Sequence, residues 1–254
     1  MNDVEQFKAD SLERIKVLGS REDLKELAYD FQHKTGRYGY LYNFEWFGLP
    51  IIQYPQDMVA LQEIVFATQP DLIIEAGVAR GGSLIFNASM LALLDLMDQK
   101  KGLNKVDRHV VGIDIEIRSH NRDKIEQHPL SSYITLIQGS SVDPATISEV
   151  RSIAGRYRRP LVLLDSDHTH EHVLQELRAY ADLVSVGSYV VVYDTVVELS
   201  PPGYYSNRPW GRGNSPLTAV RQFLAESDSF QIDEALPNKL LITVAPDGFL
   251  RRVR

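Results

Sequence analysis

The sequence predicts an α/β fold in which helices cover both faces of a mostly parallel, seven-stranded sheet. Five short runs rich in valine, isoleucine and leucine alternate with helical patterns, and each run is apolar almost throughout. Strands of this kind are buried on both faces, which is typical of parallel sheets. A chain of 254 residues with 44% hydrophobic composition is long and apolar enough to bury such a core.

The elements before the sheet differ in character. Residues 3–30 show the apolar spacing of an amphipathic helix that is interrupted near Gly19. The segment 36–55 is aromatic and punctuated by glycine and proline, which predicts a loop that could cover a cleft. A helix follows from residue 57, because apolar residues recur on one face of it. These residues are Met58, Leu61, Ile64 and Val65.

Strands and helices then alternate. The five strands are expected at 71–77, 109–114, 133–139, 160–165 and 188–194. The helices are expected at 82–97, 119–127, 143–157, 171–182 and 216–227. Ser83 could cap the first of these helices. Residues 230–250 predict two further strands with no helix between them, which form an antiparallel hairpin.

Five strand–helix units followed by an antiparallel hairpin are the layout of the Rossmann-like class I methyltransferases. We therefore expect a helical and aromatic extension over residues 1–56, which covers the site, and a methyltransferase domain over 57–254. In the usual order of this sheet the fourth strand lies beside the first, and the fifth lies beside the fourth. Ligands bind beyond the carboxyl ends of such strands.

The composition excludes several classes of function. The net charge of −7 argues against a nucleic-acid partner. The chain has no cysteine, which rules out disulfides, thiolate metal sites and cysteine nucleophiles. The apolar runs are far shorter than the roughly 20 residues that span a bilayer, and the first residues lack the apolar core of a signal peptide. We expect a cytoplasmic protein without a transmembrane segment.

The stretch EAGVARGGS, residues 75–83, is the first turn that points to a ligand. Its glycines let the backbone approach a ligand, and the helix that follows presents free N–H groups. The spacing G-x-x-x-G-G is not the G-x-G-x-x-G of NAD sites, and the preceding acid suits the amino group of S-adenosylmethionine. A tight turn that needs glycine for packing is the alternative.

Later strand ends complete the predicted cofactor site. Asp114 would accept hydrogen bonds from ribose hydroxyls, and two serines after the third strand lie where adenine contacts fall. These serines and Asp143 could equally cap a helix. The predicted cofactor-binding residues are Glu75, Gly77, Arg80, Gly81, Ser83, Asp114, Ser140 and Ser141.

LLDSDHTHEH, residues 163–172, gathers three acids and three histidines after the fourth strand. Asp165 and Asp194 would end neighbouring strands, and two adjacent carboxylates suit Mg²⁺, which lowers the pKa of a bound hydroxyl. His168 could then remove the proton as general base. Asp167 and Thr169 are candidates for the N-cap of the next helix, and Asp167 is alternatively a further metal ligand.

Two more histidines of this stretch have simpler interpretations. His170 and His172 are expected to be solvated residues at the start of the helix. Alternatively His168 and His172, four residues apart, share a helix face and hold iron together with a carboxylate.

Five segments of the chain resemble a known family. They are IEAGVARGGSLIF, GSSVDPATI, LLDSDHTHEHVLQEL, GSYVVVYDT and APDGFLRR. Together they resemble the cephalosporin hydroxylase-type family, and most closely its rhamnosyl O-methyltransferase branch, which methylates sugar hydroxyls of glycolipids. The resemblance implies a class I methyltransferase fold with S-adenosylmethionine and Mg²⁺. It also implies Asp165 and Asp194 as metal ligands, His168 as base, and Glu75, Gly77, Ser83 and Asp114 around the cofactor.

One position departs from the family pattern. The fifth strand of the family usually ends Glu-Asp-Thr, whereas here Tyr193 precedes Asp194. One carboxylate is therefore missing from the expected set of metal ligands. Either Asp167 or water takes its place, or metal binding is weak, or the enzyme works without metal.

The loop SPPGYYSNRPWGRGNSP, residues 200–216, is expected to contact the acceptor. It follows the strand that ends near Asp194, so it could fold over the site as a lid that excludes water. A packed loop or a subunit contact is the alternative, and 36–55 is also a fair candidate for an oligomer interface. Because aromatic rings stack on sugar faces, the predicted substrate residues are Tyr40, Trp46, Tyr204, Trp210 and Arg212.

Taken together, these features predict a homo-oligomeric, S-adenosylmethionine-dependent O-methyltransferase that Mg²⁺ assists. The acceptor would be a sugar or polyol hydroxyl of a glycolipid, polysaccharide or glycosylated natural product, methylated by in-line displacement. An iron-dependent hydroxylase and a non-catalytic cofactor-binding module are the alternatives. An NAD-dependent oxidoreductase is disfavoured, because its glycine motif is missing.

Overall fold

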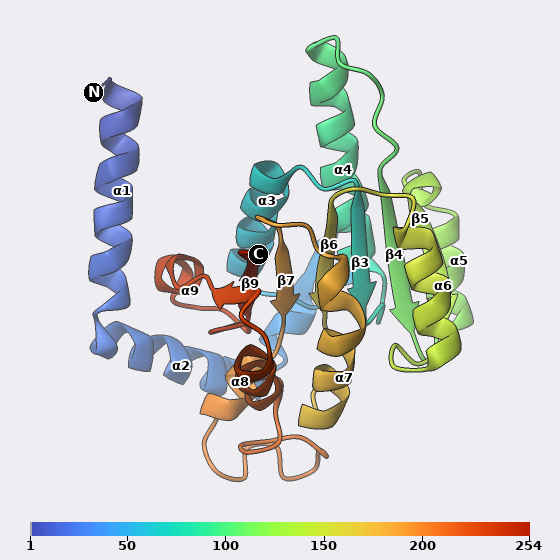
Figure 1. The fold of residues 1–254 in the computed structure, drawn as a ribbon. Helices are drawn as coiled ribbons and strands as arrows, with labels where there is room; N and C mark the ends of the chain where they lie inside the picture. The colour runs from blue at the N-terminus through green and yellow to red at the C-terminus, as the bar shows by residue number, and fades with distance from the viewer. Residues whose placement is uncertain (1) are drawn as a thin grey trace.

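A computed structural model of the chain describes residues 2–254, with a seven-stranded sheet at its centre (Figure 1). The strands are β3 (Leu72–Ala76), β4 (His109–Asp114), β5 (Ile134–Gln138), β6 (Pro160–Leu164), β7 (Tyr189–Val192), β8 (Phe230–Ile232) and β9 (Phe249–Arg252). Their order is β5-β4-β3-β6-β7-β9-β8; the first five of that order are parallel, and β9 is antiparallel to β7 and β8. The predicted sheet is confirmed, because β6 lies between β3 and β7.

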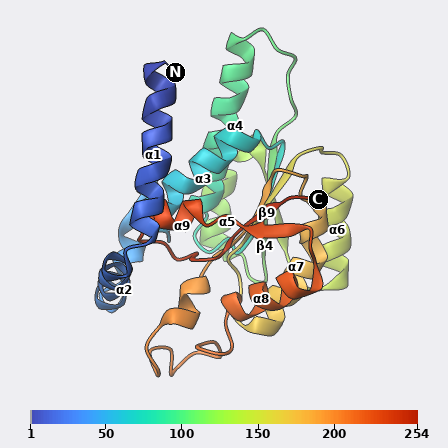
Figure 2. The ribbon, with the colours of Figure 1, turned by 60° about the vertical axis from the view of Figure 1, so that its left-hand side comes forward.

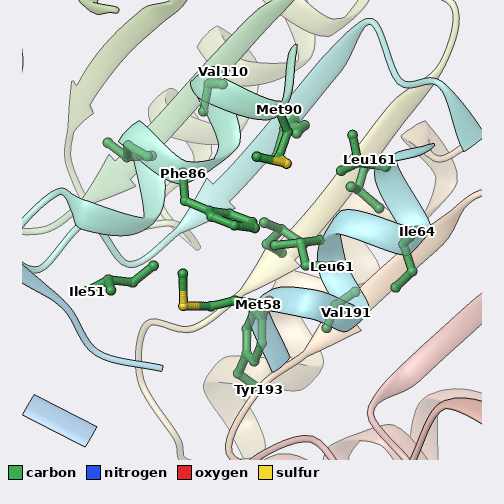
Figure 3. Packing of buried hydrophobic residues seen from close by; sticks show 14 of the residues in the cluster. Ile51, Met58, Leu61, Ile64, Phe86, Met90, Val110, Leu161, Val191 and Tyr193 are labelled. Atoms are coloured by element: carbon green, nitrogen blue, oxygen red, sulfur yellow. The ribbon is translucent and has the colours of Figure 1, made fainter. Parts of the chain in front are cut away.

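Helices cover both faces of this sheet, since each helix has apolar residues to bury. α3 (Pro55–Thr68), α4 (Gly82–Lys100) and α5 (Ser119–Glu126) cover one face. α6 (Pro144–Ala154), α7 (His170–Tyr180) and α8 (Pro216–Glu226) cover the other. Figure 3 shows the first core, in which residues of α3 and α4 such as Leu61 and Phe86 meet the strands. Each large apolar side chain buried there contributes about 1.5–3 kcal/mol.

The N-terminal part contains two helices and a hairpin. α1 (Asp3–Gly19) buries no residue and stands away from the sheet, and α2 (Glu22–Gly36) follows after a break at Ser20 (Figure 1 and Figure 2). The 3₁₀ turn η1 (Tyr40–Asn43) leads into an antiparallel pair, β1 (Phe44–Trp46) and β2 (Leu49–Ile51). The prediction of a loop over 36–55 was therefore wrong in its second half. The Pro50 carbonyl approaches Gly82 so closely that a side chain at Gly82 would collide with it.

The chain also differs from the prediction near its end. A short helix, α9 (Ala235–Leu240), lies between β8 and β9, where the sequence predicts none. Only Leu236 and Leu240 of this helix pack against the core, and two apolar residues are too few for a periodic signal. Three further 3₁₀ turns connect the elements: η2 (Ser131–Tyr133), η3 (Ala181–Leu183) and η4 (Thr195–Leu199). Among residues 2–254, no helix is both long and apolar enough to cross a membrane.

Candidate active site

Asp165, His168 and Asp194 form a cluster at the carboxyl edge of the sheet. Asp165 directly follows β6, and Asp194 comes two residues after the neighbouring strand β7. One ligand atom from each residue lies within 4.8 Å of the others, and His168 Nε2 is 3.5 Å from Asp194 Oδ2. Asp194 has a φ of +55°, a backbone conformation that is uncommon outside glycine and is often found at functional sites.

The first glycine of the predicted cofactor turn meets this cluster. Gly77 has a φ of +104°, and a Cβ atom there would collide with the backbone carbonyl of Asp165. The turn can therefore pass the end of β6 only with glycine at this position. The ends of β3, β6 and β7 converge, as the predicted strand order requires.

Burial and negative charge together dominate the electrostatics of the cluster. Burial raises the pKa of Asp165 well above its ordinary value, and the charges of Asp194 and Glu75 raise it further. Two close, buried carboxylates avoid the repulsion between their negative charges by sharing a proton or by binding a cation. Their oxygens are the ligands that Mg²⁺ prefers, and one imidazole beside them leaves room for other oxygen ligands, so the residues fit such an ion.

Asp167 lies outside the cluster, although the sequence made it a candidate ligand or cap. Its Oδ1 accepts a hydrogen bond from the Thr169 backbone N–H at 2.8 Å and another from the Thr169 hydroxyl at 2.6 Å. Despite partial burial, these bonds hold the pKa of Asp167 below its usual range. Thr169, not Asp167, occupies the N-cap position of α7. Asp167 therefore shapes the turn that carries His168.

Glu75 lies behind the site rather than in it, which differs from the sequence prediction. It is inside β3 and only 3% exposed, and its carboxylate accepts hydrogen bonds from the Ser83 hydroxyl and, at 2.6 Å, from Asn87 Nδ2. Burial raises the pKa of Glu75 to about 7, although both bonds oppose the shift. Ser83 is accordingly not the helix cap; Gly81 precedes α4, and the Ser83 hydroxyl ties α4 to β3.

Two adjoining cavities open at the cluster, with volumes of about 410 and 400 Å³. We call them the histidine cavity, which His168 and Asp194 line, and the serine cavity, which Ser140 and Ser141 line. They share Gly77, Ala79, Asp165, Ser166 and Trp210. Both volumes lie in the range of small-molecule sites.

The predicted cofactor residues divide between these cavities. Gly77, Arg80, Gly81 and Ser83 line the histidine cavity, whereas Asp114, Ser140 and Ser141 line the serine cavity. Asp114 Oδ2 accepts hydrogen bonds from the backbone N–H groups of Val78 and Ala79, at 3.0 and 3.2 Å, which holds the glycine turn against β4. Asp143 caps α6, one of the two alternatives for that residue.

A buried polar network borders the serine cavity, and it was not predicted from the sequence. Glu176 is fully buried in α7, and its Oε1 accepts hydrogen bonds from the hydroxyls of Ser141 and Ser166. His172 Nε2 lies 2.9 Å from the Ser141 hydroxyl and 3.4 Å from Glu176 Oε1. The expectation that His172 is solvated was wrong. The sequence did contain a signal for the burial of Glu176, because this residue lies on the apolar stripe of α7, three residues after Val173.

Because His172 belongs to this network, the free energy of unfolding should depend on pH. Burial lowers the pKa of His172, but the hydrogen bond and charge of Glu176, with help from Asp167, raise it overall. A histidine whose folded pKa is raised stabilises the fold fully below its unfolded pKa near 6.5 and loses this contribution as pH rises through the folded value. Replacing His172 by Gln should therefore lower the melting temperature more at pH 5.5 than at pH 8.5. Equal losses at both pH values in scanning calorimetry would contradict this account.

The alternative iron site, with His168 and His172 as ligands, does not form. Among the described residues, the Asp165–His168–Asp194 cluster contains one imidazole, and His172 points to Ser141 and Glu176 instead. His170 forms hydrogen bonds through both ring nitrogens: Nδ1 lies 2.8 Å from the Thr218 hydroxyl, and Nε2 lies 3.0 Å from Gln222 Oε1. The expectation that His170 is a solvated residue was therefore wrong.

The predicted substrate residues separate into two groups. Tyr204 and Trp210 line the histidine cavity, and the Trp210 ring meets His168 edge to face at 4.8 Å. Arg212, Tyr40 and Trp46 line neither cavity. Tyr40 packs against Phe31 and Phe44, and Trp46 Nε1 donates a hydrogen bond to Ser89. The lining residues absent from that predicted set include Gln53, Tyr205 and Arg208.

Comparison with known proteins identifies the family of this chain. The family model Rhamnosyl O-methyltransferase/CmcI matches residues 38–253. The chain belongs to this family. It is 30% identical over 200 residues, 77% of this chain and 73% of the relative, to the rhamnosyl O-methyltransferase of Mycobacterium tuberculosis strain H37Rv. It is 26% identical over 211 residues, 82% of each chain, to that of Mycobacterium leprae.

Solved structures agree on the fold of this family member. A structure of CmcI with Mg and SAM superposes with a TM-score of 0.55 at 22% identity, covering 84% of this chain and 78% of that one. Cofactor-bound Rv0187 from MTB gives a TM-score of 0.54 at 18% identity, covering 82% and 84%. The class I methyltransferase fold and the O-methyltransferase family inferred from the motifs are therefore confirmed.

Tyr193 stands where the resemblance predicts a glutamate, and its side chain does not face the site. It is 3% exposed, lines neither cavity and points into the core that also holds Met58 (Figure 3). Burial, and then the charges of Asp57 and Asp165, raise its pKa well above the ordinary value for tyrosine. The residue before Asp194 is therefore a buried, neutral phenol and supplies no carboxylate to the cluster.

Proposed function

We propose that this chain transfers a methyl group from S-adenosylmethionine to a hydroxyl of a sugar or similar polyol. The observation that carries the proposal is the position of the Asp165–His168–Asp194 cluster, at the junction of two cavities and beside the Gly77 turn. A donor in one cavity and an acceptor in the other would meet at this junction. Holding two reactants in line is the main contribution that such an enzyme makes.

The serine cavity and the glycine turn suit the donor. S-adenosylmethionine supplies an activated methyl group on a sulfonium. Asp114 and Ser140 line this cavity; Asp114 would accept hydrogen bonds from the ribose, and Ser140 would contact the adenine. Arg80 and Gly81 line the part of the turn that faces the histidine cavity, where the amino acid end would lie. The CmcI structure that resembles this chain contains SAM, which supports the choice of donor.

The cluster suits an acceptor hydroxyl that must lose a proton. Asp165 and Asp194 would hold Mg²⁺, which lowers the pKa of a hydroxyl that it binds. His168, whose Nε2 lies 3.5 Å from Asp194 and whose ring packs against Trp210, would take the proton as general base. Mg is also present in the CmcI structure.

The histidine cavity has the character of a sugar site. Tyr42, Tyr204, Tyr205 and Trp210 line it, together with Arg208, whose guanidinium lies over the Trp210 ring. Rings of this kind stack on sugar faces, and the similar mycobacterial enzymes are named for a rhamnosyl acceptor. Residues of the extension 1–56 and of the loop 200–216 contribute to the wall, which supports their assignment as a cover and a lid.

We also infer that the protein is a homo-oligomer that works in the cytoplasm. Large apolar side chains of α1 are exposed, at 53–67% of their surface, and would suit a contact between subunits. They are Val4, Phe7, Leu12 and Val17. A reducing compartment is compatible with a chain that has no cysteine.

Binding calorimetry tests the donor and the ion. We expect S-adenosylmethionine to bind and NAD not to bind, and we expect Mg²⁺ to bind the wild type but not the variant with both Asp165 and Asp194 changed to Asn. Binding of NAD in place of S-adenosylmethionine would overturn the proposal.

The role of His168 makes a separate prediction. Changing His168 to Gln should lower the rate of methyl transfer by about 10²–10⁴-fold, the usual contribution of a general base. The affinity for S-adenosylmethionine should stay within about twofold. Changing His170 to Gln is the matched control, because His170 bonds to Thr218 and Gln222 outside both cavities. A full rate in the His168 variant would remove it from the mechanism.

A further inference from the structure

The strained backbone of Asp194 is bound on both sides by one segment, residues 243–248, which we call the clamp loop. The φ of Asp194, +55°, lies in the left-handed region that residues other than glycine seldom adopt. Such a conformation persists only where the surrounding structure enforces it. The clamp loop contains the first four residues of the motif APDGFLRR, which the chemistry proposed above does not use.

The clamp loop contacts the chain closely just before Asp194. The Val192 N–H donates a hydrogen bond to the Gly248 carbonyl at 2.8 Å. A Cβ atom at Gly248 would lie 2.1 Å from the Val192 carbonyl oxygen, so only glycine permits this approach. Because Val192 is the last residue of β7, the clamp loop meets this strand where it ends.

Two further hydrogen bonds hold the residues that follow Asp194. The Thr195 hydroxyl donates to the Pro246 carbonyl, and the Val196 N–H donates to the Val244 carbonyl at 3.2 Å. Thr195 is 0% exposed, so water cannot replace the acceptor of its hydroxyl. Relaxation of Asp194 toward an ordinary φ would therefore disturb bonds on one side of it or the other.

The clamp loop is itself anchored to α3 by a buried acid. The Asp57 carboxylate, 1% exposed, accepts hydrogen bonds from the Thr243 hydroxyl and, at 3.0 Å, from the Val244 N–H. The Thr243 hydroxyl in turn accepts a hydrogen bond from the Ala245 N–H at 2.9 Å. A buried carboxylate is costly to leave unpaired, so these bonds fix the loop to the helix layer. A chain of contacts thus runs from α3 through the clamp loop to Asp194.

We propose that Thr195 and Thr243 are positioning residues that hold the Asp194 carboxylate in the cluster. The negative charges of Asp165 and Asp194 repel each other, so an unrestrained Asp194 would turn away. Neither threonine lines the histidine or the serine cavity, so both act through the backbone and do not touch a ligand. This inference rests on the proposed function, since it assumes that the cluster binds Mg²⁺.

The test measures the affinity of the full chain for Mg²⁺ by isothermal titration calorimetry, without any turnover. Thr195→Val keeps the shape of the side chain and removes only the hydroxyl. We expect its dissociation constant for Mg²⁺ to rise by about 10–100-fold, the usual effect of losing a group that supports a metal ligand. Thr195→Ser restores the hydroxyl and should recover the affinity of the wild type. Thr243→Val removes the other hydroxyl without changing any charge, and it should weaken Mg²⁺ binding in the same direction.

Ser188→Ala is the matched control for a lost buried hydroxyl. Ser188 is 4% exposed and donates its hydroxyl to the Pro160 carbonyl at 3.2 Å, at the opposite end of β7 from Asp194. Its loss should lower the melting temperature as Thr195→Val does, but it should leave the affinity for Mg²⁺ unchanged. S-adenosylmethionine should bind all of these variants as tightly as it binds the wild type.

The outcomes are distinct. If the wild type binds Mg²⁺ and Thr195→Val binds it equally well, the inference is wrong and the proposed function stands. The inference is also wrong if Ser188→Ala weakens Mg²⁺ binding as much, because general loss of stability then accounts for the effect. If Thr195→Val does not fold, Thr243→Val decides by the same comparison. If the wild type does not bind Mg²⁺, the metal-binding part of the proposed function fails, and the inference fails with it.

Discussion

Changing Asp194 to Asn should lower the rate of methyl transfer by about 10³-fold at saturating substrates. The carboxylate of Asp194 lies 3.5 Å from His168 and forms the cluster with Asp165. Its loss would remove the negative charge that we propose binds Mg²⁺ and orients His168, and a Lewis acid is worth several kcal/mol of barrier. Asparagine is the appropriate replacement, because it tolerates the positive φ of +55° at this position.

Two further measurements make this result specific. Isothermal titration should show that Asp194→Asn no longer binds Mg²⁺, while its melting temperature stays within a few degrees of the wild type. Asp182→Asn is the matched control, since Asp182 pairs with Arg151 and lies outside the cluster and both cavities, and it should keep most of the activity. Full activity of Asp194→Asn would show that the cluster is not the reaction centre.

Changing Gly77 to Ala should destabilise the protein by more than about 4 kcal/mol, enough to lower the melting temperature by about 10 °C or to prevent folding. The new Cβ atom would collide with the Asp165 carbonyl, which is backbone and cannot rotate away. The Asp165 N–H is bonded to the Ala76 carbonyl at 2.8 Å, so β6 cannot shift without losing pairing to β3. Thermal unfolding monitored by circular dichroism measures the effect.

Gly187 provides the matched control for this substitution. Its φ of +89° resembles that of Gly77, but a Cβ atom there would meet nothing within 4 Å. Gly187→Ala should therefore cost only the backbone strain, about 1–2 kcal/mol. If both variants lose the same stability, the positive φ alone explains Gly77, and the close approach of the turn to β6 contributes nothing.

The predicted site was most accurate for residues at the ends of strands. Asp165 and Asp194 could be placed together from strand order alone, since adjacent parallel strands end at the same edge. Glu75 was predicted to line the cofactor site, but its side chain points from β3 to Ser83 and Asn87 of α4. When a strand is apolar throughout, its sequence does not show which side chains face the covering helix. The turning of Trp46 toward Ser89 likewise has no sequence signal, whereas Glu176 is detectable from its position on the apolar stripe of α7.

The amino-acid sequence by itself determined the α/β class, the strand order and the acids at the carboxyl edge, because burial patterns and chain connectivity are local or topological properties. Only the tertiary structure decided which side chains face the cavities. Gln53 reaches the histidine cavity and Tyr193 turns into the core because of packing between segments about 140 residues apart in the chain. Contacts over such separations depend on how the layers fit together, and no periodicity within either segment encodes them.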